Sequence, residues 1–224
     1  MSLQFIMGNS GSGKSYCLYD TVVREAIENP DKNYLVIVPE QFTMQTQKDL
    51  CLAHPKGGIM NIDVLSFGRL AYRVFEEVGQ DARVVLDDEG KNLVLRKIAG
   101  ECEKDLKVFK GNLKKQGYIS EVKSVLSEFA QYGVDFERLD DFMKEVPPES
   151  YLHYKLDDIR TIYEKFEEYL SEKYITKEEM LDVLSDAVPY SDILKGSVVA
   201  MDGFTGFTPV QNRLIGELFQ CAKK

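Results

Sequence analysis

The sequence predicts an α/β protein in which a domain with a parallel sheet is interrupted by an all-helical insertion. Near the start of the chain and again near its end, short apolar runs alternate with amphipathic stretches, which favours strands connected by helices. Between them, no strand-like run is convincing. We therefore expect one domain from residues 1–83 and 191–224, and a helical insertion from residues 84–190.

Four short apolar runs are predicted to form the strands of the sheet. The run at 34–38 is wholly apolar and stops at Pro39, as in a strand buried on both faces. Further candidate strands lie at 3–7, 62–65 and 198–201, and candidate helices lie at 15–27, 67–78 and 210–221.

The insertion shows apolar residues at helical spacing. One stripe begins at Ile119 and reaches Ala130, with Gly133 following as a candidate C-cap, and another runs from Leu156 to Leu170. Thr176 to Glu179 has the form of a capping box that starts a shorter helix. We interpret these stripes as the core of a helical subdomain.

Composition favours a protein of the cytoplasm. Charged residues make up 29% of the chain, and no apolar run approaches the ~20 residues that a membrane span requires. The first residues lack the pattern of a secretory signal, so we expect no membrane association. The four widely separated cysteines are interpreted as free thiols of a reducing compartment. The net charge of −9 arises mainly between residues 84 and 195, so the flanks remain compatible with DNA.

A complete phosphate-binding motif follows the first candidate strand and opens the first candidate helix. Its form is G-x-x-x-x-G-K-S, from Gly8 to Ser15. Backbone N–H groups of such a loop surround the phosphates, the lysine reaches the β- and γ-oxygens, and the serine hydroxyl is a Mg²⁺ ligand. The motif predicts a RecA-like P-loop domain that binds ATP and Mg²⁺ through residues Gly8, Ser10, Gly11, Ser12, Gly13, Lys14 and Ser15.

An acidic residue at the end of another strand completes the predicted metal site. Asp202 follows the apolar run 198–201, where P-loop proteins place the carboxylate that supports Mg²⁺. In hydrolysing enzymes a glutamate often comes next, but the following residue is Gly203. The sequence therefore predicts nucleotide binding with weak or absent hydrolysis, and no catalytic residue is assigned.

The segment from Asp202 to Gln211 resembles the second motif of superfamily 1 helicases of the UvrD type. In those proteins a glutamine at similar spacing contacts the γ-phosphate, and Gln211 lies nine residues beyond Asp202. Two other segments, V-P-E-Q-F-T at 38–43 and V-L-S-F-G-R-L-A-Y-R-V at 64–74, resemble the helicase segments that contact single-stranded DNA.

These segments suggest DNA contacts of three kinds. Phe67 and Tyr72 could stack on bases, Arg69 could contact a phosphate, and Gln41 could donate hydrogen bonds. The aromatic residues could equally pack a helix against the sheet. The full predicted DNA-contacting set is Gln41, Thr43, Ser66, Phe67, Arg69, Tyr72, Phe204 and Phe207.

Taken together, the P-loop, the two segments and M-D-G-F-T-G-F-T-P-V-Q at 201–211 resemble the start of the AddB (RexB) family of bacterial recombination proteins. The resemblance implies a helicase-like nuclease subunit that partners the motor subunit AddA and carries the 3′ single strand at processed DNA ends. It also implies a contact with the Chi sequence, a second helicase-like domain and a nuclease domain with an iron-sulfur cluster. Those parts are not in this sequence, so we expect it to be an N-terminal piece.

Two other functions are compatible with a P-loop. A small-molecule kinase with a helical lid would need lid arginines, and the insertion has only Arg96, Arg138 and Arg160, widely spaced. An interaction scaffold with a vestigial P-loop would show no response to nucleotide.

Overall fold

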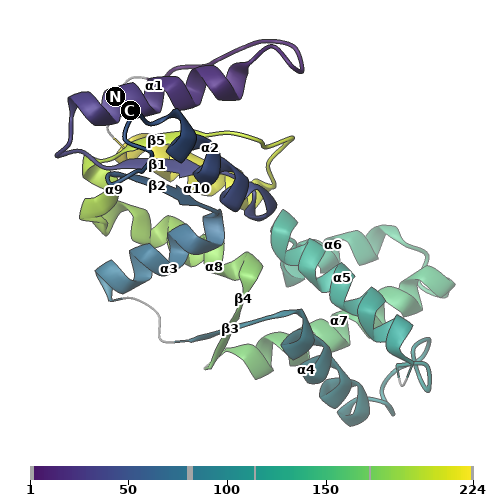
Figure 1. Ribbon diagram of the computed structural model, residues 1–224. Helices are drawn as coiled ribbons and strands as arrows, with labels where there is room; N and C mark the ends of the chain where they lie inside the picture. Colours follow the sequence, from purple (N-terminus) through teal and green to yellow (C-terminus); the bar gives the residue numbers. More distant parts are fainter. Residues whose placement is uncertain (1–2, 80–82, 114, 172, 223–224) are drawn as a thin grey trace. The chain divides into compact units, whose positions relative to one another are not determined.

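The computed structural model describes residues 3–79, 83–113, 115–171 and 173–222 (Figure 1). Its internal contacts divide the chain into two units. The sheet unit contains most of the described residues before 80 and after 180, and the helical unit contains most of those from 83 to 180. The boundary at which the chain returns from the helical unit to the sheet unit falls within helix α8 (Lys177–Ala187). The sequence instead predicts this boundary at residues 190–191.

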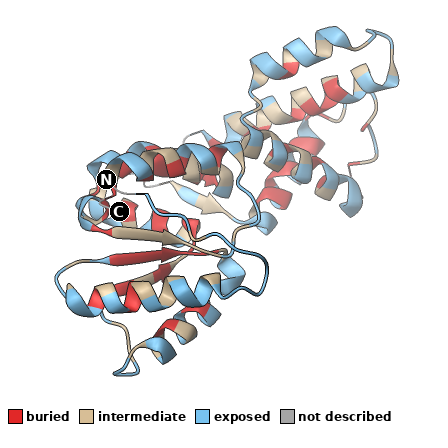
Figure 2. Ribbon diagram, turned by 90° about the horizontal axis from the view of Figure 1, so that it is seen from above, coloured by how far each residue is buried: buried red, intermediate tan, exposed pale blue. Residues whose placement is uncertain are grey.

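The sheet unit is built on three parallel strands, as the sequence predicted for these runs. They are β1 (Tyr34–Ile37), β2 (Ile62–Leu65) and β5 (Val198–Met201), in the order β2-β1-β5. The register is even, because Ile37 lies opposite both Leu65 and Met201. All four residues of the central strand β1 are buried, which explains its wholly apolar sequence (Figure 2).

Helices cover both faces of this sheet (Figure 1). Helices α1 (Lys14–Glu28) and α2 (Thr43–Ala53) form one apolar core with the strands, in which Val22, Val36 and Leu50 are buried. Helix α3 (Phe67–Val78) lies on the other side of the sheet, where Leu70 and Val74 are fully buried. A short turn of 3₁₀ helix, η1 (Glu40–Phe42), joins β1 to α2.

The prediction of a strand at 3–7 was wrong. Residues 3–9 form no strand, and the side chains of Leu3, Phe5 and Met7 are exposed by 52%, 74% and 90%. An isolated run of apolar residues becomes a strand only when a neighbour supplies its backbone hydrogen bonds. In the described part of the chain, no strand pairs with these residues.

The remaining elements of the sheet unit are fixed by buried and charged contacts. They are η2 (Val188–Tyr190), α9 (Asp192–Gly196) and α10 (Pro209–Cys221). The carboxylate of Glu77 accepts hydrogen bonds from the backbone N–H groups of Asp192 and Ile193, both at 2.9 Å, and so caps α9 from the end of α3. Arg213 of α10 forms ion pairs with Asp182 and Asp186 of α8.

The helical unit is not all helical. Besides α4 (Asp88–Glu101), α5 (Gln116–Tyr132), α6 (Phe136–Glu145) and α7 (Tyr151–Leu170), it contains two short strands, β3 (Val84–Leu86) and β4 (Tyr174–Thr176). These strands are parallel and pair with each other. Each has three residues and its partner is distant in sequence, so no periodic pattern could indicate them.

The predicted apolar stripes form the core of this unit. Ile119, Val122 and Leu126 of α5 are buried together with Ile162 and Phe166 of α7 and with residues of α4. The capping box is also confirmed, although strand β4 immediately precedes its helix. The Glu179 carboxylate accepts a hydrogen bond from the Thr176 N–H at 2.7 Å, and the Glu179 N–H donates to the Thr176 hydroxyl at 3.2 Å.

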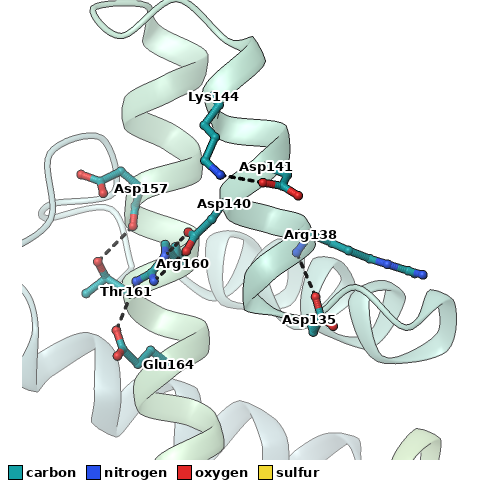
Figure 3. A network of polar contacts seen from close by, with 9 residues as sticks. All are labelled: Asp135, Arg138, Asp140, Asp141, Lys144, Asp157, Arg160, Thr161 and Glu164. Carbon is teal, nitrogen blue, oxygen red and sulfur yellow. Dashed lines mark hydrogen bonds and ion pairs between the residues drawn. The ribbon is translucent and has the colours of Figure 1, made fainter.

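Polar contacts connect α7 to its surroundings. On the surface, Arg160 forms a two-pronged contact with Asp140 of α6, and the hydrogen bonding from Arg160, helped by its charge, lowers the pKa of that carboxylate (Figure 3). In the interior, Asp158 is 1% exposed and accepts three backbone hydrogen bonds, from Lys107, Val108 and Phe109, at 2.7 to 2.8 Å. Asp158 therefore fixes the segment that joins α4 to α5.

A glycine turn follows β5. Gly203 has φ of 78°, a left-handed conformation that favours glycine. A Cβ atom there would lie 3.4 Å from the Phe42 ring and 3.5 Å from Pro39. These are ordinary van der Waals distances, so the reason for glycine at this turn is its left-handed backbone conformation.

We predict that Asp158→Asn lowers the free energy of unfolding by about 2–3 kcal/mol, because an amide NH₂ would face at least one buried N–H donor. Urea denaturation followed by circular dichroism measures the change. The matched control is Asp157→Asn, which removes an exposed ion pair with Lys107 and should cost less than about 1 kcal/mol. Equal effects of the two variants would contradict the structural role of Asp158.

We predict that Gly203→Ala lowers the free energy of unfolding by about 1 kcal/mol, because alanine is strained at positive φ. The control is Gly206→Ala in the same turn, where an added Cβ meets no atom within 4 Å. That variant should change stability by less than about 0.5 kcal/mol. The same denaturation experiment compares the two, and a Gly203→Ala variant as stable as the parent would refute the strained turn.

Candidate nucleotide-binding site

The predicted phosphate loop leads directly into helix α1. Gly13 is the N-cap of α1, with φ of 82°, and Gly11 has φ of 76°. No side chain caps the helix among the described residues, so the first-turn N–H groups are available to an anion. The loop is exposed to solvent. This combination of left-handed glycines and an uncapped helix terminus is what phosphate binding requires.

Lys14 bends back over the loop. Its ammonium group donates to the backbone carbonyls of Gly8 at 2.9 Å and Asn9 at 2.8 Å. The loop itself is closed by the Ser12 N–H, which donates to the Asn9 carbonyl at 3.2 Å. A Cβ on Gly8 would lie 2.4 Å from the Ser12 hydroxyl, so the loop is tight at this glycine. The lysine charge is thus positioned at the loop before any ligand arrives.

A cavity of about 420 Å³ lies beside the loop, within the sheet unit. Lys14 and Asp202 both line it. Most of the other lining residues are apolar and come from α1, β5, α10 and the segment 3–6. The lysine and the carboxylate that the sequence assigned to one site therefore line the same cavity, whereas residues 8–13 of the loop and Ser15 do not line it.

Asp202 is fixed at the end of β5 by two contacts. Its N–H donates to the carbonyl of Ile37 at 3.1 Å, which continues the hydrogen bonding of the sheet beyond the strand. Its carboxylate accepts a hydrogen bond from the Tyr19 hydroxyl at 2.9 Å. Tyr19 lies on α1 and also contacts the Thr46 hydroxyl of α2, at 3.2 Å. Burial, with a further contribution from Asp202, raises the pKa of Tyr19 to about 12, so its phenol remains a donor.

The sequence did not identify Tyr19 and Thr46. Tyr19 follows Ser15 by one helical turn, a spacing that places both residues on the same side of α1. This spacing from Ser15 was the feature of the sequence that could have indicated Tyr19 as part of the site. The partners of the Tyr19 hydroxyl, however, are distant in sequence.

The residue types present match those that a P-loop site uses for ATP with Mg²⁺, namely a serine hydroxyl at Ser15, the Asp202 carboxylate and the Lys14 ammonium. Lys14 and Asp202 line the cavity, whereas Ser15 is exposed and is not among the described residues that line it. Gln211 lies in the first turn of α10, and it is not among the described residues that line the cavity. Gly203 offers no side chain next to Asp202.

The predicted DNA-contacting segments lie at one edge of the sheet. Because the three strands are parallel and in register, Pro39, Ser66 and Asp202 all follow carboxyl ends at the same edge. The nearest atoms that a Cβ on Gly203 would meet belong to Phe42 and Pro39, so two of these loops touch. The structure thus brings together segments that are far apart in the chain.

Three of the predicted DNA-contacting side chains are buried here. Ser66 caps α3 by accepting from the Arg69 N–H at 3.3 Å, and Thr43 donates to the Glu40 carbonyl at 2.9 Å. Phe67 is 7% exposed and packs against Phe204, with ring centroids 5.3 Å apart. In this conformation these side chains stabilise the fold, and no base could stack on Phe67 without displacing its neighbour.

The exposed members of the set are Gln41, Arg69, Tyr72 and Phe207. Phe207 is 39% exposed and its ring packs at a tilt against Phe204, with centroids 5.0 Å apart, so a row of rings runs from the core to the surface. Phe42, 45% exposed in the same region, was not among the predicted contacts. On the surface, Nε of Arg69 lies 4.0 Å from Oε1 of Glu40.

Of the helices in the described part of the chain, none combines the length and apolar composition needed to cross a membrane.

Comparison with known proteins gives a consistent family. The family model described as "ADDB, N-terminal" matches residues 5–224. The chain is 48% identical, over its whole length, to a protein of Lachnoclostridium phytofermentans that is named as a subunit of an ATP-dependent helicase/deoxyribonuclease. Proteins with the same name from Clostridium tetani and Alkaliphilus metalliredigens are 37% and 36% identical over 100% and 98% of the chain.

The chain spans about a fifth of the length of these relatives, since it covers 19 to 20% of each. The match extends from the phosphate loop through both units to the last helix. The chain therefore belongs to the AddB family and corresponds to its N-terminal part.

Proposed function

We propose that this chain is the nucleotide-binding, DNA-contacting N-terminal part of an AddB subunit, in an ATP-dependent helicase and deoxyribonuclease. The main support is that the phosphate-loop lysine and Asp202 line one cavity. The relatives' name, which includes ATP dependence and helicase activity, agrees with this proposal.

The sheet unit would be a RecA-like P-loop domain. A parallel sheet, helices on both faces and a phosphate loop at the start of α1 are consistent with that fold. Backbone N–H groups from Gly11 to Ser15 would bind the phosphates, Lys14 would neutralise their β- and γ-oxygens, and Ser15 with Asp202 would support Mg²⁺. Gln211 would respond to the γ-phosphate only after α10 or the nucleotide brought the two together.

We propose further that the chain binds ATP without efficient hydrolysis. Hydrolysis needs a group that orients the attacking water, and the position after Asp202 is a glycine at positive φ. A glutamate could not occupy that position without strain and contact with Phe42. Bound nucleotide would then have a structural or regulatory role in the subunit.

In the whole protein, this part would contact the 3′ single strand during processing of DNA ends for recombinational repair. The AddA motor subunit would be the partner, and contact with Chi would involve the same sheet edge. The iron-sulfur cluster and the nuclease would belong to the remainder of the subunit, and the complex would act in the cytoplasm.

A small-molecule kinase with a helical lid is less well supported. Of the three arginines that such a lid could use, Arg160 is engaged with Asp140 and Glu164, and Arg138 donates to the Gly133 carbonyl. These contacts lie within the helical unit itself. A vestigial P-loop on an interaction scaffold is the other alternative, and nucleotide binding distinguishes it.

We predict that ATP with Mg²⁺ stabilises the chain by about 2–4 kcal/mol near saturation, and that Lys14→Ala abolishes this effect. Thermal unfolding with and without several millimolar nucleotide measures the stabilisation. Lys32→Ala is the control, because Lys32 lies in the loop after α1 and its ammonium group donates to the nearby Asn29 side chain. No stabilisation of the parent would support the scaffold, and phosphate transfer to a small acceptor would support the kinase.

We predict weak binding of single-stranded DNA at the sheet edge. Tyr72→Ala should weaken binding by about 1–3 kcal/mol if a base stacks there, and Arg69→Ala should reduce the salt dependence by about one phosphate contact. Fluorescence anisotropy with a labelled oligonucleotide at several salt concentrations measures both. Tyr190→Ala is the matched control, since this exposed tyrosine precedes the amino end of β5. If Tyr72→Ala and Arg69→Ala both bind as the parent and the control do, the proposed edge is not the DNA site.

A further inference from the structure

The Tyr19 hydroxyl stands between three elements of the sheet unit. Tyr19 belongs to α1, Asp202 follows β5, and Thr46 is 3% exposed on α2. The phenol has one proton, and an ionised carboxylate can only accept. The proton therefore goes to Asp202, at 2.9 Å, and the Thr46 hydroxyl donates to the phenol oxygen, at 3.2 Å.

This chain of donors fixes one oxygen of the carboxylate. The contact uses Oδ2 of Asp202, so the other oxygen keeps its lone pairs for a further partner. The main chain of Asp202 is fixed independently by its bond to Ile37. Because the main chain and Oδ2 of Asp202 are both held, the carboxylate cannot rotate without breaking the contact with the Tyr19 hydroxyl.

We propose that Tyr19 is a positioning residue for magnesium-bound nucleotide, which holds the Asp202 carboxylate in the orientation that supports the metal, with Thr46 orienting Tyr19. This inference rests on the proposed nucleotide function and adds a residue that neither the motif nor the family match assigns. Removal of a hydrogen bond that orients a metal-supporting carboxylate commonly lowers the affinity for the metal by tenfold or more.

A second consequence concerns α2. This helix begins directly after the exposed turn Glu40–Phe42, which lies at the proposed DNA edge. Thr46 is one turn into α2, so the hydroxyl chain joins the metal-supporting carboxylate to the helix that follows this edge. The contact is therefore placed to transmit a change at Asp202 to the proposed DNA-contacting region.

A purely structural role would have Tyr19 only pack α1 against α2. The two roles differ in one measurable quantity, the dependence of nucleotide affinity on Mg²⁺. Packing affects affinity with and without the metal alike. Positioning affects only the gain that the metal provides.

The test is isothermal titration of the 224-residue chain with ATP, in excess Mg²⁺ and again in EDTA. Tyr19→Phe removes only the hydroxyl oxygen. We expect it to reduce the magnesium-dependent gain in affinity by about tenfold or more, in line with the loss of a hydrogen bond to a charged group. Affinity in EDTA should be unchanged.

Two further variants sharpen the test. Thr46→Val should act in the same direction with a smaller effect, because Tyr19 keeps its proton but loses its orienting donor. In an Asp202→Asn background, Tyr19→Phe should have no additional effect on the magnesium-dependent gain, since the two residues act through one contact.

The matched control is Tyr34→Phe. Tyr34 is also buried, and its hydroxyl donates to the Glu25 carbonyl at 2.9 Å, away from the phosphate loop near the other end of α1. This variant should leave the magnesium-dependent gain at the parent value. Should Tyr19→Phe fail to fold by circular dichroism, Thr46→Val carries the same test.

The outcomes separate the two proposals. Suppose that the parent chain binds ATP more tightly with Mg²⁺ and that Tyr19→Phe shows the same magnesium-dependent gain in affinity. This result would overturn the role of Tyr19 and leave the nucleotide function intact. A parent chain that binds no nucleotide would overturn both. A selective loss in Tyr19→Phe, absent in Tyr34→Phe, would establish Tyr19 as the positioning residue.

Discussion

The in-register pairing of three parallel strands is the constraint on which the candidate site depends. Since Ile37, Leu65 and Met201 lie side by side, the chain leaves all three strands at one edge of the sheet. The backbone pairing even continues past β5, through the bond from Asp202 to Ile37. Segments distant in sequence therefore meet at that edge. A slip of one residue would move every side chain of the slipped strand to the opposite face of the sheet, so the packing of the helices on both faces restrains the register.

Two opposite charges are kept near one cavity without being paired to each other. Lys14 is bonded to loop carbonyls, and Asp202 is bonded to a neutral phenol. Neither contact neutralises the charge. Such an arrangement suits a ligand that carries both signs, as a metal-bound phosphate does. The uncapped N-terminus of α1 adds a further positive potential at the same loop.

Aromatic residues near the sheet edge show how one pattern can serve both folding and recognition. Phe67 is in the core, Phe204 is half-buried and Phe207 is exposed, and their rings contact one another in that order. A base stacked on the outer ring would thus rest on a row of rings that begins in the core. The sequence motif included all three without distinguishing them, because an aromatic residue in a turn has the same appearance whether its neighbour is protein or solvent.

The sequence by itself determined the glycine-rich loop before α1, the three strands of the sheet, the helical stripes and the family, because these depend on local spacing and on apolar periodicity. Only the tertiary structure decided that residues 3–9 form no strand, that β3 pairs with β4, and that Ser66 and Phe67 are buried. Each of these depends on a partner far away in the chain. The same holds for Tyr19, whose phenol finds Asp202 and Thr46 only after α1, α2 and β5 have assembled. Hydrogen-bond partners across elements are not encoded in the spacing of any one segment, and for this reason the site's charges were predictable while the contacts that orient them were not.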